Sequence, residues 1–218
     1  MVEKEELIKK YNIDIQKLER EQLVLAKKLE INNKIDFSLA DKFGGVSITF
    51  IKNKILCGII VCNRDYEVID KAYTLEKIRF PYISGFRAYR ELPAIVETFN
   101  KLNEKPDLVF LPAQGISHPR LGLASHFSIV TGVPSIGISD SCFDCKINGK
   151  DILKDGKKVG KIFVSKEKSR PMYISPGNKI SIETSLEFSE KLINFPHKKP
   201  EPLHLAGKYL KEVKKELI

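Results

Sequence analysis

Three consecutive β-branched segments, separated by short turns, place the strongest limit on how this chain can fold. They are GGVSITFIK at 44–52, ILCGIIVCN at 55–63 and EVIDKAYTL at 67–75, with the turn residues NK and RDY between them. Short runs rich in valine, isoleucine and threonine, bounded by turn residues, are typical of strands. Such short connections join antiparallel neighbours, so the sequence predicts a three-strand antiparallel meander.

After the meander, strand-like and helix-like segments alternate. LPAIVETFNKL (92–102) and LGLASHFSIVTG (121–132) have helical patterns, and DLVFL (107–111) and PSIGIS (134–139) read as buried strands. Alternation of this kind predicts parallel crossovers. KIFVS and MYISPG then flank a basic loop, followed by a helix at 181–193 and another from about Pro202. The predicted fold class is α/β, a mixed sheet of meander plus parallel strands flanked by helices.

The chain is expected to form one domain over residues 1–218. At 218 residues and 42% hydrophobic composition it can bury one sizeable core, and it contains no repeat or obvious linker. Residues 1–32 are predicted to be an N-terminal helical segment. Within it, residues 3–31 have helical periodicity, and a buried stripe is predicted at Leu18, Leu23, Leu25, Leu29 and Ile31.

The charge balance favours a polyanionic partner such as nucleic acid. The formal net charge is +9 and the sequence pI is about 9.2, and a basic surface attracts phosphate at long range. The alternative is that the lysines are only solvated, as in a soluble, heat-adapted protein. The charged N-terminal segment has no apolar stretch that could act as a signal peptide or membrane span, so we expect a cytoplasmic protein with no membrane contact.

The four cysteines are predicted to be core residues. Cys57 and Cys62 lie in the apolar run ILCGIIVC, which resembles a buried strand. Cys142 and Cys145 form a C-x-x-C pair without a glycine-rich knuckle, so a zinc site is the less favoured alternative. A reducing cytoplasm also disfavours disulfides.

Four motifs carry a family resemblance. RFPYISGFRAYRELPAI, PDLVFLPAQGISHPRLGLASHFSIVTGVPSIGIS, YISPGNKISIETSLE and PEPLHLA, spread over roughly residues 37–207, together resemble endonuclease V. That family nicks nucleic acid near deaminated adenine (inosine). The resemblance implies a ribonuclease H-like fold, and it implies site residues only where the motifs match.

Two matching segments are implied to contact nucleic acid. PYISGF corresponds to the family's wedge beside the lesion and places Tyr82 and Gly85 there, since an aromatic ring can replace lost base stacking. The alternative is that Tyr82 packs the loop against the core. QGISHPR matches the loop around the expelled base, which implies contacts from four residues, Gly115, Ser117, His118 and Arg120.

The acidic metal site of the family is largely replaced. Aspartates are expected where this chain has Ser47 and Pro112, and only Glu91 remains. Asp140 stands where the family has lysine, and Gly207 stands where it has an acid or histidine. Mg²⁺ prefers oxygen ligands that include carboxylates, so no bound metal is expected. Pro112 is interpreted as ending a strand that has lost its catalytic acid.

Three functional hypotheses follow. The first is a nucleic-acid-binding endonuclease V homologue, impaired as a nuclease, with Glu91 vestigial. The second is an active inosine-directed endonuclease of DNA repair, in which Glu91, a shifted acid (Asp140, Asp41 or Asp144) and Mg²⁺ or Mn²⁺ form a rearranged site. The third is a repurposed scaffold that binds a nucleotide or a protein partner. The sequence leaves the oligomeric state and the choice between DNA and RNA open.

Overall fold

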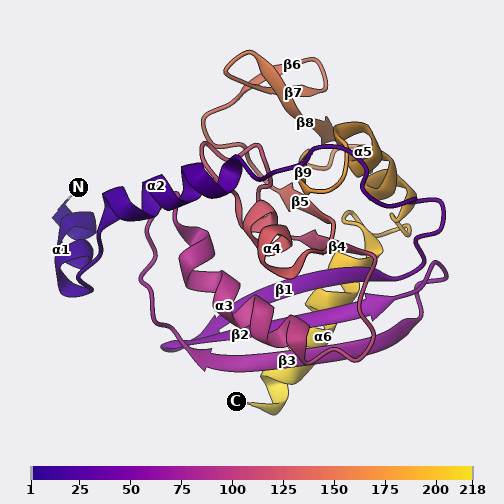
Figure 1. Ribbon diagram of the computed structural model, residues 1–218. Coiled ribbons are helices and arrows are strands. Elements are labelled where there is room, and N and C mark those ends of the chain that lie inside the picture. Colours follow the sequence, from indigo (N-terminus) through magenta and orange to yellow (C-terminus); the bar gives the residue numbers. More distant parts are fainter. Residues whose placement is uncertain (1, 218) are drawn as a thin grey trace.

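The computed structural model describes residues 2–217 and is built on one nine-stranded mixed sheet (Figure 1). The strand order is β3-β2-β1-β4-β5-β9-β8-β7-β6. The strands are β1 (Phe43–Ile51), β2 (Lys54–Cys62), β3 (Val68–Lys77), β4 (Leu108–Leu111), β5 (Ser135–Ser139), β6 (Lys146–Asn148), β7 (Asp151–Lys154), β8 (Lys157–Phe163) and β9 (Met172–Asn178). The helices are α1 (Val2–Lys10), α2 (Ile15–Ala26), α3 (Arg87–Asn100), α4 (Leu123–Thr131), α5 (Ile182–Lys191) and α6 (Glu201–Glu216).

The predicted meander is confirmed. Strands β1, β2 and β3 pair antiparallel in sequence order, with Ser47 opposite Gly58 in the first pair. The predicted parallel crossovers are also confirmed, because β4 pairs parallel with both β1 and β5. The sheet then returns to antiparallel pairing from β5 to β9 and onward.

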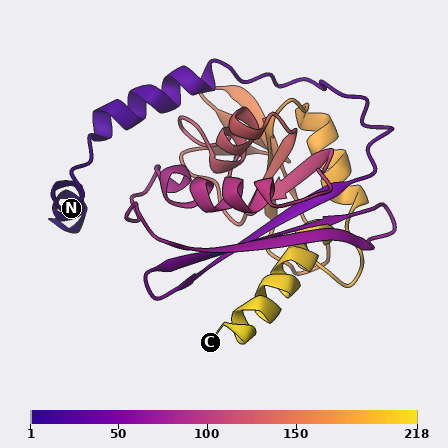
Figure 2. The same ribbon diagram turned by 60° about the horizontal axis from the view of Figure 1, so that its bottom comes forward.

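Helices cover both faces of the sheet (Figures 1 and 2). On one face, α3 and α4 pack over alternate strand residues such as Val46 and Ile59. On the other, α5 and α6 pack over the residues between them, such as Phe43 and Ile60. This period-two alternation buries β2 on both sides, which explains its nearly continuous apolar sequence.

The N-terminal segment is helical in two pieces, α1 and α2, and its predicted buried stripe is only partly buried. The chain breaks between α1 and α2, where Asn12 has φ +51° and the Asp14 side chain accepts a hydrogen bond from the Lys17 N–H as the N-cap of α2. In α2 the buried residue is Gln22, and Leu23 is 51% exposed. The other predicted stripe residues, Leu18, Leu25, Leu29 and Ile31, are half-buried, and the last two lie after the end of α2.

Two of the four cysteines also differ from the prediction. Cys57 and Cys62 are fully buried, as expected. Cys142 and Cys145 are only half-buried and form a disulfide in the loop before β6. Residues three apart reach disulfide distance here because this loop, unlike a strand, folds back on itself. Among residues 2–217, no helix is long and apolar enough to cross a membrane.

Candidate nucleic-acid interface

Two positions that correspond to the family's metal site lie where the pairing of two neighbouring parallel strands, β1 and β4, ends. Gly45 of β1 pairs with Phe110 of β4, so Ser47 and Pro112 lie two residues further along neighbouring strands. Strand β4 ends at Leu111, and Pro112 follows directly, in agreement with its predicted role as a strand end. Glu91 approaches the same place from the first turns of α3.

An arginine occupies the centre of this site. Arg87, the first residue of α3, donates from Nε to both carboxylate oxygens of Glu91 at 2.8 Å. One terminal nitrogen, Nη1, donates to the Pro112 carbonyl oxygen at 2.9 Å. The Glu91 side chain is only 5% exposed, whereas that of Arg87 is 41% exposed. Arg87 therefore covers the one retained acid and links it to the end of β4.

A divalent metal does not fit these residues. A metal held by Glu91 needs the carboxylate oxygens that Arg87 already contacts, and the guanidinium brings a positive charge to the same point. Ser47 supplies a neutral hydroxyl, and the Pro112 carbonyl is bonded to Arg87. Mg²⁺ requires nearly octahedral oxygen ligation with at least one or two available carboxylates. In this arrangement the residues present therefore do not match the metal site that the family resemblance implies.

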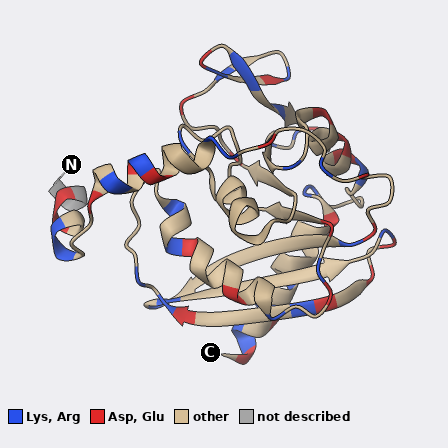
Figure 3. Ribbon diagram, viewed as in Figure 1, with Lys and Arg blue, Asp and Glu red and all other residues tan. Residues whose placement is uncertain are grey.

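A basic groove lies over the same strand ends. We define it by the charged and polar residues among its lining, which are Ser47, Arg87, Lys199, His204, Lys208 and Lys211. Its volume is about 620 Å³, and no Asp or Glu lines it among the described residues. Lys208 and Lys211 are exposed on α6, and neither forms an ion pair with a described carboxylate. Figure 3 shows basic positions recurring along α6. The groove suits an anion.

A second cavity, of about 360 Å³, adjoins the groove through Arg87, Pro112 and Lys199, which line both. We call it the wedge cavity because Tyr82, a residue that is 64% exposed, lines it. Tyr82 is therefore not packed into the core. The buried Gln114 Nε2, which has no hydrogen-bond partner in residues 2–217, belongs to a residue that also lines this cavity.

The predicted contact residues occupy different positions around the cavities. Gly85 and His118 line the wedge cavity, as does the replaced position Asp140. The replaced positions Ser47 and Gly207 line the basic groove. Asp140 also lies 3.9 Å from the Lys199 ammonium group. Half of the residues predicted to contact nucleic acid, and the positions where family site residues are replaced, therefore line these two adjoining cavities.

The other three residues predicted to contact nucleic acid, Gly115, Ser117 and Arg120, make packing or hydrogen-bond contacts within the protein. A Cβ at Gly115 would lie 2.0 Å from the Pro176 carbonyl oxygen, so glycine is needed for close packing on β9. Ser117 is buried and its hydroxyl hydrogen-bonds Ser175. Arg120 donates to Gln22 at 2.7 Å and pairs with Glu19 at 3.1 Å. Their role in nucleic-acid contact stays a prediction.

Gln22 fixes the wall of the wedge cavity, and sequence analysis missed it. Its amide nitrogen donates to the Gly85 carbonyl at 3.1 Å and its oxygen accepts from Arg120. A glutamine at this position in an amphipathic helix gives no sequence signal, because polar residues usually lie on the solvent face. Arg87 was missed for a similar reason, since an i,i+4 Arg–Glu pair is typical of exposed helix surfaces.

The lysines of the hairpin formed by β7 and β8 largely contact partners within the protein. Lys154 donates to the carbonyls of His118 and Pro119 at 2.9 and 2.5 Å. Lys158 lies 3.0 Å from Glu183, and Lys161 lies 3.3 Å from Asp151. These lysines support the loop beside the wedge cavity or pair across the hairpin, so they are less available to phosphate than Lys208 and Lys211.

The histidine of the loop is held neutral. Burial, and then the nearby charges of Arg120 and Lys154, lower the pKa of His118 to about 4. Its Nδ1 accepts a hydrogen bond from the Arg120 backbone N–H at 3.1 Å, so Nε2 carries the proton. His118 therefore offers a neutral donor to a ligand at pH 7, rather than a positive charge.

This lowered pKa predicts a pH dependence of stability. The unfolded chain binds a proton on His118 near pH 6.5, whereas the folded chain does so only near pH 4. Folding stability therefore falls as pH drops from 6.5 toward 4. In His118→Asn, which can still accept from the Arg120 N–H, we expect this loss to shrink by about 2–3 kcal/mol, discounted for partial exposure. Urea unfolding at pH 7 and pH 4 measures it, and parallel pH profiles of the two proteins would contradict it.

Comparison with known proteins supports the resemblance seen in the motifs. The family model described as Endonuclease V matches residues 24–208 of the chain. The chain belongs to the endonuclease V family. An Endonuclease V of Thermosipho melanesiensis is 34% identical over 221 residues, covering 94% of this chain and 97% of the relative. An Endonuclease V of Archaeoglobus fulgidus is 30% identical over 212 residues, covering 94% and 96%.

Solved endonuclease V structures share the fold. The Bacillus subtilis protein superposes with a TM-score of 0.84 at 27% identity, over 95% of each chain. A Ciona intestinalis endonuclease V, solved in complex with a 23mer DNA containing an inosine followed by a ribo-adenosine, has a TM-score of 0.84 at 20% identity and covers 94% of this chain and 100% of that one. The predicted ribonuclease H-like fold is thereby confirmed. The family match begins within α2, so α1 lies outside it.

Proposed function

We propose that this member of the endonuclease V family binds nucleic acid, including inosine-containing strands, and does not cut it by a metal-dependent route. The observation that carries the proposal is the Arg87 side chain, which bonds both oxygens of Glu91 and the Pro112 carbonyl. Phosphodiester hydrolysis by metals requires ions that activate water and stabilise the leaving oxygen. Here the Arg87 guanidinium is hydrogen-bonded to the carboxylate and carbonyl oxygens that those ions would need as ligands.

Binding is supported by charge and by shape. The basic groove offers Arg87 and three lysines to a phosphate backbone, and such contacts contribute most of the affinity for nucleic acid. The adjoining wedge cavity has the exposed Tyr82 in its lining, whose ring can stack on a base or fill the gap that a displaced base leaves. A relative of the same fold was solved with inosine-containing DNA.

Recognition of a base is supported by two residues that line the wedge cavity, Gln114 and His118. Gln114 Nε2 has no hydrogen-bond partner among residues 2–217, and an unpaired buried donor costs free energy. Because the atom is itself buried, the side chain must turn toward the cavity before a ligand can accept from it. His118 is neutral and can donate from Nε2. Hypoxanthine carries a carbonyl oxygen and ring nitrogens that can accept such bonds. The two residues are thus suited to contact a base rather than a phosphate.

The alternative of an active nuclease depends on an acid that can join Glu91. Asp41 lies 3.6 Å from Arg64 and precedes the start of β1, whereas the basic groove lies further along that strand. Asp140 lines the wedge cavity and faces Lys199. Asp144 is exposed in the loop before β6 and lines neither cavity. Because Arg87 already contacts both Glu91 oxygens and none of the three acids has a described contact with Glu91, binding without cleavage is the favoured proposal.

The test is whether binding needs a divalent metal. Fluorescein-labelled single strands and duplexes, each with and without one inosine, are titrated with protein in EDTA and in Mg²⁺ while anisotropy is read. We expect saturable binding of equal affinity in both solutions, stronger for the inosine strands. Binding that appears only with Mg²⁺ would contradict the proposal, and no binding in either solution would favour the repurposed scaffold.

A further inference from the structure

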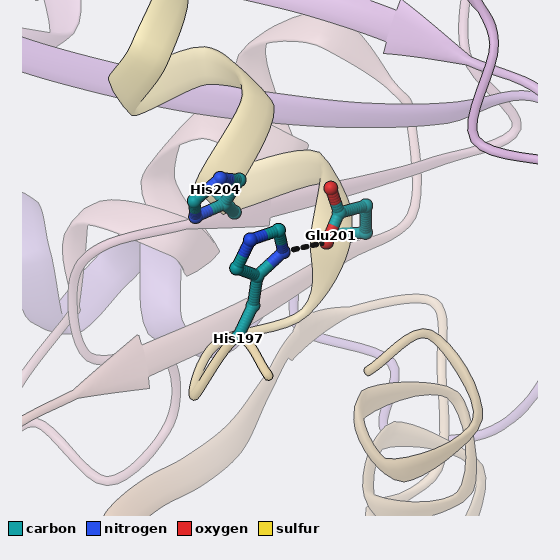
Figure 4. A group of neighbouring side chains, drawn as sticks. All are labelled: His197, Glu201 and His204. Atoms are coloured by element: carbon teal, nitrogen blue, oxygen red, sulfur yellow. Dashed lines mark hydrogen bonds and ion pairs between the residues drawn. The ribbon is translucent and has the colours of Figure 1, made fainter. Parts of the chain in front are cut away.

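Two histidines and one glutamate gather where the chain enters α6, beside the basic groove. His197 Nδ1 lies 2.7 Å from Glu201 Oε2, and the rings of His197 and His204 stack with centroids 3.4 Å apart. One potential ligand atom from each of the three residues lies within 4.8 Å of the others. Figure 4 shows the three side chains turned toward one another.

The local sequence explains the arrangement. Glu201 is the first residue of α6, after Pro200 as its N-cap, and its N–H donates to the Leu192 carbonyl at 2.7 Å. His204 follows three residues later, so it projects from the same face of the helix. His197 comes from the turn before the helix, where its N–H donates to the Asn194 carbonyl at 2.9 Å. Two elements therefore present the three groups to one point.

We propose that His197, Glu201 and His204 bind one transition-metal ion of the zinc class. Two imidazoles and one carboxylate are a ligand set that Zn²⁺ accepts, and a fourth position is then open to water or a ligand. A Glu-x-x-His pair on one helix face supplies two metal ligands in metal-binding helical bundles. Mg²⁺ is a poor fit because it prefers oxygen ligands.

The three groups can surround an ion if one contact lengthens and one imidazole ring turns. Ligand atoms around a tetrahedral ion with bonds of 2.0–2.1 Å are about 3.3 Å apart. The contact between His197 and Glu201 must open from 2.7 Å toward that value. An ion shared by two imidazoles lies in the plane of each ring, and these rings are only 12° from parallel. One ring must therefore turn about its Cβ–Cγ bond, which is a soft torsion.

The cluster has features that an ion would use. The Glu201 side chain is 5% exposed, so its charge is removed from water and has only His197 as a side-chain partner in the described residues. The His204 ring forms no hydrogen bond there and lines the basic groove. The open fourth position therefore lies beside the groove. This site does not depend on nucleic-acid binding, and it involves neither Glu91 nor Arg87.

Metal titration without nucleic acid tests the site. The disulfide-bonded form is used, so that Cys142 and Cys145 cannot compete as thiolates. Zn²⁺ is titrated by calorimetry, and Co²⁺ by its visible absorption, which reports tetrahedral nitrogen and oxygen ligation. We expect one ion per chain, and at least about 100-fold weaker binding in His204→Gln and in His197→Gln.

Controls separate the site from other histidines and from unfolding. His126→Gln removes a histidine on α4, outside the cluster, and should leave the affinity for Zn²⁺ unchanged. Thermal melts confirm that each variant is folded, and His204→Arg gives a second replacement that cannot bind metal. In the natural protein, NMR should show the ring signals of His197 and His204 shifting with one equivalent of Zn²⁺.

Two results would overturn this proposal. One is the absence of saturable Zn²⁺ and Co²⁺ binding to the folded natural protein. The other is binding that His204→Gln and His197→Gln leave intact. Neither result bears on whether the groove binds nucleic acid, because the metal-free affinity for oligonucleotides is measured in EDTA.

Discussion

Mg²⁺-dependent nicking of inosine-containing strands is expected when three residues are exchanged together, Ser47→Asp, Pro112→Asp and Arg87→Leu. The first two changes place carboxylates at the adjoining ends of β1 and β4. The third frees the Glu91 oxygens that Arg87 Nε now contacts at 2.8 Å. Three carboxylates at one point can bind Mg²⁺, and the bound cation would neutralise negative charge on the leaving oxygen.

We expect the triple variant to nick at least about 10²-fold faster than the natural chain, which corresponds to about 2.7 kcal/mol of barrier. The matched control carries Ser47→Asn, Pro112→Asn and Arg87→Leu, with the same side-chain sizes but no added charge, and should stay inactive. Arg87→Leu alone should also stay inactive, because Glu91 by itself cannot hold the ion.

Gly207 allows the design to be extended. A Cβ built at this position meets no atom within 4 Å, so a larger side chain fits without displacing α6. Adding Gly207→Asp to the triple variant should raise the rate further. If the triple variant binds Mg²⁺ but neither it nor the extended form nicks any strand, the loss of acids is not what separates this chain from an active nuclease.

A large drop in affinity for nucleic acid is expected when Lys199, Lys208 and Lys211 are changed to Gln. All three line the basic groove, and the latter two have no described ion-pair partner. Each lysine that neutralises a phosphate contributes about one unit to the slope of log affinity against log salt. The slope should therefore fall by about 3, and the affinity at 0.1 M salt by roughly 10²-fold.

The control variant removes three lysine charges far along the sequence from the groove residues. Lys9, Lys27 and Lys28 are exposed on or just after the N-terminal helices and line neither cavity. Changing these three to Gln lowers the net charge equally, so it should alter the salt slope by less than about one unit. Equal slopes in the two triple variants would mean that binding follows net charge and not the groove.

The pattern of hydrophobic residues predicted most of the fold, because the periodicity and the length of an apolar segment depend only on the local sequence. The β-branched runs over 44–75 and the short turns between them predicted the meander, and Gly132, with φ +77°, closes α4 at the end of the helical pattern. The short strands β6 and β7 were not predicted as strands. β6 is exposed along its whole length, so it has no buried face to produce an apolar pattern.

The site was less predictable because it depends on which way side chains point. Glu91 and Arg87 have the spacing of an ordinary surface pair, and only tertiary packing against β4 turns the carboxylate inward. Lys208 and Lys211 carry no sequence signal that separates them from solvated lysines, and they line the groove only because α6 packs on β1. The spacing of His197, Glu201 and His204 was a usable signal that went unnoticed.

The nicking assay of the natural protein tests the central claim most directly. Labelled inosine strands and duplexes are incubated with excess protein in Mg²⁺ or Mn²⁺ and resolved on a denaturing gel. With Arg87 bound to Glu91, we predict no product above the metal-free control. Metal-dependent nicking that Glu91→Gln abolishes would contradict the account, since it would mean that Glu91 releases Arg87 and ligates a metal with another residue.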